Sequence, residues 1–278
     1  MLNKIFMRFP GGLPKAFTLS YDDGVEQDIQ LVEIMDKYGL KGTFNLNAGL
    51  YAPEGTIYPA GRVHRRMTRS QCIEAFKNHE VATHGYTHPW PEKINSATVC
   101  YEIIKDREAL ERDFGRVING HAYPYGNYSD SVVECLKNCG IVYARTTKPT
   151  EKFDVPKDWL RLHPTCHHNH PKVFELCDTF VSLKIDATQH FYLWGHSYEF
   201  EGDNNWDRIV EIAEKISGKD DIWYATNIEV YNYVKAYEAL VFAADMTRVY
   251  NPSALEVFFI LNGKSLSVKP GETIALGE

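Results

Sequence analysis

Carboxylate and histidine side chains recur in this sequence just after short apolar stretches. Asp22 and Asp23 follow the alternating segment 17–21 and precede Gly24. Adjacent carboxylates repel each other, so a fold keeps such a pair only where a cation or a helix cap offsets the repulsion. Two interpretations of this stretch stay open. Asp22 caps a helix that begins near Val25, or the pair supplies a metal ligand beside a general base.

His84 and His88 are the second set of candidate chemical groups. They are four positions apart in His-Gly-Tyr-Thr-His, a spacing that can bring both imidazoles to one metal ion. Alone, the pattern also fits two histidines that are hydrogen-bonded in a loop. One aspartate and two histidines would leave a position open for water on Zn²⁺ or a similar ion. Such an ion lowers the pKa of bound water and polarises a carbonyl group.

The elements that must position these groups alternate between strand and helix. Residues 27–38 have helical spacing and end at Gly39, and residues 41–47 have the pattern of the next strand. The alternation continues to about residue 240 and gives roughly seven strand–helix units. The carboxyl ends of parallel strands in an α/β barrel face one mouth. We therefore expect one shared site for the following residues: Asp22, Asp23, His84, His88, Tyr125 and His196.

The pattern changes near Val241, where short β-type runs replace the alternation. Asn262-Gly263 is a strong hairpin turn signal. We predict an α/β fold with a distorted barrel over residues 1–240 and a small β appendage over residues 241–278. The appendage is too short for an independent sandwich, so we expect it to pack against the barrel.

Bulk composition narrows the class of protein. The 278 residues are 44% hydrophobic and 24% charged, which is ordinary for a globular chain. The net charge of -7 argues against a nucleic-acid partner. No apolar run approaches membrane-spanning length, and the N-terminus lacks the apolar core of a signal peptide. Six scattered cysteines fit reduced thiols, so we expect a cytoplasmic protein with no membrane partner.

Four ordered motifs resemble those of polysaccharide deacetylases, which form carbohydrate esterase family 4. The motifs are Ser20–Gly24, His84–His88, Tyr123–Gly126 and Leu193–His196. The resemblance covers about residues 15–230 and not the tail, and its strength lies in the shared order and spacing. It implies a distorted barrel of seven strands, in accord with the count of strand–helix units.

The resemblance also implies a metal site. Asp23, His84 and His88 would bind a divalent ion, for which we expect Zn²⁺, with Co²⁺, Ni²⁺ or Mn²⁺ as alternatives. Asp22 would be the general base that activates water.

Two further roles follow from the resemblance. The backbone N–H of Tyr125 would stabilise the oxyanion, and His196 would be the general acid. For each residue a second interpretation stays open. Tyr125 could be a packing aromatic in an ordinary turn, and His196 could be a histidine buried beside Trp194.

The sequence departs from the family pattern at two places. The family has an arginine two positions before the motif proline, where this chain has Ala122, so Arg145 is a candidate replacement for holding the base. The fourth family motif pairs Asp with Trp, and Asp158-Trp159 is the nearest match. Asp158 could then orient His196, although capping or core packing is an equal alternative. Trp159 and Trp194 are the expected substrate-binding aromatics.

Two polar clusters remain without a firm role. The histidines of segment 165–170 could hold a second metal, line the substrate groove or form a solvated turn, and groove or surface is favoured. A basic cluster is interpreted as a solvated face, with recognition of an acidic glycan as the alternative. It comprises Arg62, His64, Arg65, Arg66 and Arg69.

The sequence thus predicts a metal-dependent hydrolase that removes acetyl groups from an N- or O-acetylated saccharide. One rival is a C–N hydrolase that acts on a small non-sugar amide on the same barrel. The other is an inactive carbohydrate-binding relative, which Ala122 keeps open. A binding module needs no general base, so the intact catalytic set counts against that second rival: Asp22, Asp23, His84, His88 and His196.

Overall fold

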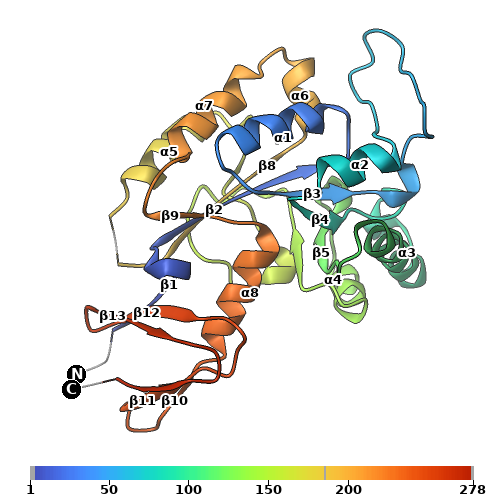
Figure 1. The fold of residues 1–278 in the computed structure, drawn as a ribbon. Coiled ribbons are helices and arrows are strands. Elements are labelled where there is room, and N and C mark those ends of the chain that lie inside the picture. The colour runs from blue at the N-terminus through green and yellow to red at the C-terminus, as the bar shows by residue number, and fades with distance from the viewer. Residues whose placement is uncertain (1–3, 185, 277–278) are drawn as a thin grey trace.

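A parallel sheet forms the centre of the molecule (Figure 1). The computed structural model describes residues 4–184 and 186–276. The strands follow the order β6-β5-β4-β3-β2-β8-β7, and β9 also pairs with β2. Their bounds are β2 Lys15–Asp22, β3 Gly42–Leu46, β4 Glu80–Thr83, β5 Gly120–Ala122, β6 Tyr143–Arg145, β7 Cys166–His167, β8 Gln189–Gly195 and β9 Ile222–Tyr224.

The sheet curls into the distorted barrel that the sequence predicts. One edge of β2 pairs with β8 over seven residues. The other edge pairs first with β9 and then, from Leu19 onward, with β3, so β9 and β3 diverge from a common neighbour. At the far side, Leu162 bridges to Arg145 of β6 before the chain continues into β7. Residues 162–167 therefore connect the two outer strands of the curled sheet.

Helices connect the strands and cover the outside of the sheet (Figure 1). Thr68 caps α2 through a capping box with Gln71. The α-helices are α1 Gln27–Lys37, α2 Arg69–Ala75, α3 Ser96–Phe114, α4 Asp130–Asn138, α5 Val173–Ser182, α6 Ser197–Gly202, α7 Asp207–Ile216 and α8 Asn227–Glu238. Short 3-10 turns are η1 Pro10–Gly12, η2 Ala48–Leu50, η3 Pro91–Lys93, η4 Pro124–Gly126 and η5 Trp159–Arg161.

Strand β2 separates an apolar layer from a polar barrel interior. All eight of its residues are buried. Phe17, Leu19 and Tyr21 pack in the main hydrophobic cluster with residues of α1, α5 and α7. The alternate residues point inward, where Thr18 contacts His190 and Ser20 accepts a hydrogen bond from an asparagine of β3. This alternation places Asp22 at the inner end of the strand.

The C-terminal segment forms two antiparallel sheets of three strands, ordered β1-β12-β13 and β10-β11-β14. The Asn262-Gly263 turn joins β12 and β13, and both residues have positive φ, as a tight hairpin requires. The strands are β1 Ile5–Arg8, β10 Val241–Phe242, β11 Arg248–Tyr250, β12 Val257–Leu261, β13 Lys264–Val268 and β14 Thr273–Ala275. Because β1 pairs with β12, the N-terminus contributes a strand to this part, and the division at residue 240 stays a prediction.

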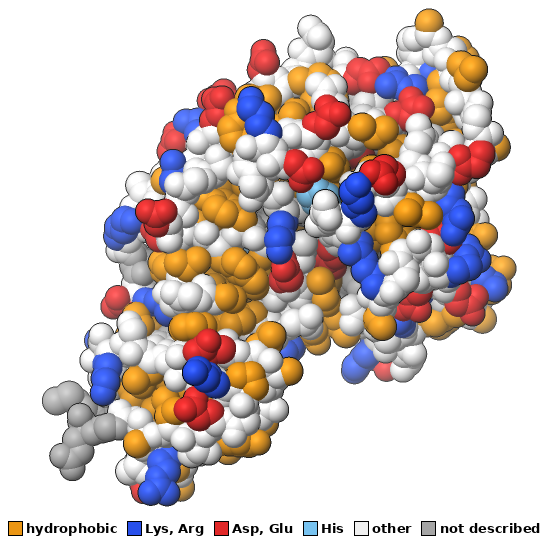
Figure 2. All heavy atoms as spheres, in the orientation of Figure 1, with side chains coloured by type: hydrophobic (Ala, Val, Ile, Leu, Met, Phe, Trp, Pro, Cys, Tyr) orange, Lys and Arg blue, Asp and Glu red, His pale blue; other side chains and the backbone are white. Residues whose placement is uncertain are grey.

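Acidic and basic side chains are interspersed over the face shown in Figure 2, so no large patch of one sign gathers there. All six cysteines are free thiols. Within residues 4–184 and 186–276, none of the helices combines the length and the apolar character that crossing a bilayer requires.

Candidate active site

One cavity of about 490 Å³ contains most of the residues that the sequence singles out. It opens beyond the carboxyl ends of β2, β4 and β8 and the turn after β5. The sequence-predicted residues that line it are Asp22, Asp23, His84, His88, Tyr125, Trp194 and His196. A larger cavity of about 640 Å³ lies elsewhere, between Lys152 and Tyr192. We place the candidate site in the smaller cavity because Asp22, Asp23 and the three motif histidines line it together.

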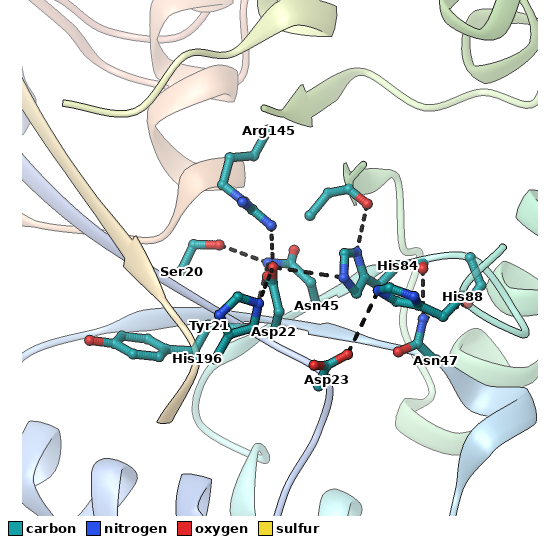
Figure 3. Close-up of polar contacts among 12 residues, drawn as sticks. Ser20, Tyr21, Asp22, Asp23, Asn45, Asn47, His84, His88, Arg145 and His196 are labelled. Carbon is teal, nitrogen blue, oxygen red and sulfur yellow. Dashed lines mark hydrogen bonds and ion pairs between the residues drawn. The ribbon is translucent and has the colours of Figure 1, made fainter. Parts of the chain in front are cut away.

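Asp22 lies in a buried network of polar groups at the end of β2 (Figure 3). The Arg145 guanidinium donates to its Oδ2, and Asn45 donates to its Oδ1 at 2.8 Å. In the sheet, Arg145 is directly opposite Ala122 on the neighbouring strand. The cation missing from position 122 is therefore supplied by the adjacent strand, as the candidate replacement predicted. Asp22 does not cap a helix, because Asp28 accepts the Val25 N–H instead.

The surroundings of Asp22 favour its ionised form. Burial acts to raise the pKa of this carboxyl, but the Arg145 guanidinium, with smaller contributions from the neighbouring His84 and His196 rings, outweighs burial and holds the pKa below its usual value. The Nε2 atoms of His84 and His196 lie 3.7 and 3.8 Å from Oδ2. Figure 3 shows these two rings on opposite sides of Asp22. Asp22 is thus a fixed carboxylate with imidazoles on both sides.

Asp23, His84 and His88 have the donor set and the spacing of a metal site. One ligand atom from each lies within 4.8 Å of the others. The His84 Nδ1 bonds to the Ala122 carbonyl oxygen at 2.7 Å, so this nitrogen carries the proton and Nε2 is left to bind a metal. Burial lowers the pKa of His84 to about 4, which keeps the ring neutral as a ligand must be. The residues present fit a divalent ion.

Hydrogen bonds with buried carboxyl and amide side chains hold the loop after β4 in place. Asp106 accepts the backbone N–H of Ala48 and of His84. Asn47 donates to the carbonyl oxygens of His84 and Gly85, both at 2.6 Å. These bonds fix the start of the His84–His88 segment, and no spacing rule in the sequence indicates them.

Arg66 and His64 contact the proposed metal ligand Asp23, which corrects the interpretation of their cluster as a solvated face. Arg66 binds Asp23 Oδ1 at 3.0 Å and donates to Asn47 at 2.7 Å. His64 Nε2 lies 3.5 Å from Asp23 Oδ2. Burial acts to raise the pKa of Asp23, but His64 and Arg66 lower it well below its ordinary value. Residues 51–66, which we call the excursion loop, precede α2 and therefore form one wall of the site.

His196 is oriented by a residue that the sequence analysis did not single out. Its Nδ1 lies 3.3 Å from Glu199 Oε1, one helical turn later. Asp158, the predicted partner, instead forms an exposed ion pair with Arg161 at 2.9 Å and lines the larger cavity. The prediction that Asp158 orients His196 is therefore corrected. A glutamate three residues after a histidine, at the start of a helix, was the available signal.

The two tryptophans predicted to bind substrate have different environments. Trp194 lines the cavity, and the Arg145 guanidinium lies over its ring at 4.3 Å. Trp159 is buried in a second hydrophobic cluster, where its ring meets Tyr231 edge-on at 5.2 Å. Trp159 is therefore a core residue, and its predicted substrate contact is corrected.

Tyr125 forms part of the rim through both ring and backbone. Its ring stacks on Trp90 at 4.5 Å and meets His88 edge-on at 4.6 Å. Its φ of 59° is unusual for a residue with a side chain and turns the backbone sharply after Pro124. No hydrogen bond among the described residues engages its backbone N–H. The turn thus presents an available donor beside the cavity.

The histidines after β7 divide into two environments. His168 is completely buried, which corrects the favoured groove or surface position for that residue. His167 and His168 lie 3.2 and 3.0 Å from Glu199 Oε2. His170 instead faces Glu151 at 3.5 Å, away from this cluster.

The fold is a curled parallel α/β barrel, and its candidate site combines aspartate and histidine side chains at the carboxyl ends of the strands. These two features define the class of protein. A family model described as polysaccharide deacetylase matches residues 11–144. This match includes the first three of the four motifs and agrees with the resemblance to the polysaccharide deacetylase family. No curated protein matches the sequence.

Solved structures extend the likeness in fold beyond residue 144. A protein of Mycobacterium smegmatis assigned as a polysaccharide deacetylase is 16% identical, with a TM-score of 0.58, over 83% of this chain and 93% of that one. The Xyl-CE4 domain of a multidomain xylanase from the hindgut metagenome of Trinervitermes trinervoides is also 16% identical. Its TM-score is 0.51, over 80% of this chain and 92% of that one.

A third alignment is shorter. It covers 47% of this chain and 55% of the Streptococcus pyogenes deacetylase PplD, with 20% identity and a TM-score of 0.42. At these identities, likeness supports the fold and does not carry an activity.

Proposed function

We propose that the protein is a metal-dependent deacetylase that hydrolyses the acetyl group of an N- or O-acetylated saccharide. The observation that carries the proposal is the pairing of a buried, ionised Asp22 with the neighbouring Asp23, His84 and His88 group. A general base beside a metal site is the arrangement that hydrolysis of an acetyl group requires.

Asp23, His84 and His88 are the residues that would hold the ion. A divalent ion bound there would polarise the acetyl carbonyl and lower the pKa of its bound water. We expect Zn²⁺, with Co²⁺, Ni²⁺ or Mn²⁺ as alternatives, because imidazole and carboxylate donors suit these metals.

The remaining steps belong to the side chains and backbone of this chain. Asp22 accepts the proton of the attacking water, since its carboxylate is ionised and fixed by Arg145. The Tyr125 N–H donates to the oxygen on which negative charge develops. Burial opposes protonation of His196, but Glu199, Asp22 and Asp23 raise its pKa above the ordinary value, which suits an acid that protonates the leaving group.

A saccharide suits the cavity because aromatic and polar groups share its rim. The stacked rings of Trp90 and Tyr125 are both more than a third exposed and give the rim an aromatic surface for a sugar to contact, although Lys93 also lies over the Trp90 ring. His64, Arg66 and Tyr198 line the same cavity with hydrogen-bonding groups. A small non-sugar amide would use little of this rim, so we favour the saccharide over that rival.

The test combines metal analysis with acetate release. Wild-type protein should release acetate from a panel of N- and O-acetylated oligosaccharides, lose activity with a chelator and regain it with Zn²⁺. Asp22→Asn should retain the metal and lose turnover by about 10²- to 10⁴-fold, the usual contribution of a general base. Asp23→Asn should lose the metal as well. Hydrolysis of small amides alone would contradict the saccharide assignment, and full activity of Asp22→Asn would contradict the base.

A further inference from the structure

We propose that Glu199 is a positioning residue for His196, and that His167 and His168 together hold its carboxylate in place. The proposal rests on the proposed function, in which His196 is the general acid. It assigns a role to the histidines after β7, to which the family motifs assign none.

Glu199 is shared among three imidazoles that come from two elements. It lies in the first turn of α6, and its Oε1 is 3.3 Å from Nδ1 of His196. Its other oxygen, Oε2, is 3.2 Å from Nε2 of His167 and 3.0 Å from Nε2 of His168. Burial acts to raise the pKa of Glu199, but these three histidines hold it far below the ordinary value. Glu199 is therefore a carboxylate anion whose Oε1 is hydrogen-bonded to His196 and whose Oε2 lies at ion-pair distance from the other two rings, with no hydrogen bond of its own among the described residues.

The tautomers of the two supporting histidines follow from their Nδ1 atoms. His167 Nδ1 accepts the backbone N–H of Asn169 at 3.1 Å, so the ring proton is on Nε2, which faces Glu199. His168 is fully buried, and neither of its ring nitrogens has a hydrogen-bond partner among the described residues. Its Nε2 lies 3.0 Å from the Glu199 carboxylate, whereas its Nδ1 has no acceptor nearby, so we assign the ring proton to Nε2.

These tautomers bear on whether the cluster holds a carboxylate in place or binds a second metal ion. The atoms of His167, His168 and Glu199 are close enough to share an ion. A metal on either Nε2 would require that nitrogen to have no proton, which moves the proton to Nδ1. In His167 that proton would face the N–H of Asn169, and in His168 it would have no acceptor. The geometry thus favours two donors that fix a carboxylate.

Packing around the cluster leaves His168 and α6 little freedom. A Cβ atom at Gly195 would lie 2.0 Å from His168 Nδ1, so only glycine leaves room for this ring. Ser197, the first residue of α6, donates to Asp28 at 2.6 Å. With Nδ1 bound to Glu199, the His196 ring presents Nε2 to the cavity, 3.8 Å from Asp22. The leaving group would be protonated from that nitrogen.

Glu199 has a predictable effect on the titration of His196. The carboxylates near His196 raise its pKa, whereas burial and the neighbouring rings oppose protonation. Replacing the anion of Glu199 with an amide removes one stabilising charge, so the pKa of His196 falls and its acid form is lost at a lower pH. The groups that face His196 are Asp22 and Asp23 at the end of β2, His167 and His168 after β7, and Tyr198 and Glu199 in α6.

The decisive variant is Glu199→Gln, with His170→Gln as its matched control, because His170 belongs to the same segment but pairs with Glu151. We expect Glu199→Gln to lower kcat by about 100-fold, a typical share of acid catalysis, with KM within about twofold. The alkaline limb of its pH profile should move to lower pH. His170→Gln should match the wild type in both respects. An unchanged alkaline limb in Glu199→Gln would overturn the proposal.

A second measurement separates this inference from the proposed function. Imidazole ¹⁵N resonances of His196 can be titrated without any substrate, and the pKa should fall in Glu199→Gln but not in His170→Gln. If Glu199→Gln does not fold, His167→Phe should produce a smaller shift in the same direction. Unchanged His196 resonances, or a second Zn²⁺ equivalent that binds wild type and is lost in Glu199→Gln, would refute the positioning role. Absence of acetate release by the wild type would refute the proposed function while leaving this titration decisive.

Discussion

The pairing of Arg145 with Asp22 predicts a large and pH-dependent loss of stability when the arginine is replaced by methionine. Both side chains are almost completely buried, at 1% and 2% exposure, so water cannot replace the lost partner. Methionine keeps much of the side-chain length and removes the charge. Removing one partner of a buried ion pair leaves the other uncompensated and costs about 3–5 kcal/mol. For a chain of this size that corresponds to a fall in Tm of about 8 °C, at about 2 °C per kcal/mol.

The assay is thermal unfolding of chelator-treated protein at pH 7 and at pH 4. In the wild type the pKa of Asp22 is depressed in the folded state, so its stabilisation is present above the unfolded pKa and is lost as pH falls through the folded pKa. In Arg145→Met, burial without the cation raises the folded pKa. The penalty is therefore present at neutral pH and shrinks as the carboxyl becomes protonated. The difference in Tm between variant and wild type should be larger at pH 7.

Arg161→Met is the matched control, since Arg161 pairs with Asp130 and Asp158 at the surface, where ion pairs contribute less than about 1 kcal/mol. If Arg145→Met unfolds within about 2 °C of this control at pH 7, the account of a buried ion pair is wrong.

Combining Arg145→Ala with Ala122→Arg should recover part of the stability that Arg145→Ala loses, because the two positions are paired across β5 and β6.

Two further variants test other contacts. Gly195→Ala should destabilise the protein by about 1–3 kcal/mol, because the added Cβ would lie 2.0 Å from His168 Nδ1. Gly202→Ala, whose nearest neighbour would be 3.5 Å away, should cost less in the same denaturant titration. Trp159→Ala should cost about 3–5 kcal/mol as a core truncation, with kcat/KM of the folded enzyme unchanged. A marked rise in KM would contradict this expectation and place Trp159 in the substrate-binding site.

Sequence reasoning predicted the barrel and the convergence of the motif residues, because both depend on local patterns. Period-2 and helical spacing indicate the strands and helices, and parallel strands bring their carboxyl ends together. Asp22, His84 and His196 could thus be grouped before their distances were known. The approximate end of the barrel could also be predicted from the change in pattern near residue 241. The pairing of β1 with β12 could not be predicted, because it joins segments about 250 residues apart and leaves no local signal in the sequence.

The partners of these residues could not be predicted in the same way. Glu199 was overlooked in favour of Asp158 because a carboxylate near a motif tryptophan and one at the next helical turn look equally suitable in sequence. Which carboxylate faces His196 depends on the direction in which α6 leaves β8. Arg66 was assigned to a solvated cluster because clustered arginines are usually exposed. Its contact with Asp23 depends on how the excursion loop folds back over β2.

The two adjacent carboxylates are compensated separately, which explains how the fold tolerates them. Asp22 points into the barrel and pairs with Arg145 from β6, whereas Asp23 points to the excursion loop and pairs with Arg66. The positive φ of Asp23 turns the chain so that the neighbouring side chains diverge. Each carboxylate is therefore paired with its own arginine, independently of any bound metal ion. In the proposed function this separation would leave one carboxylate for the water and the other for the metal, with the ligand group held in place by the protein.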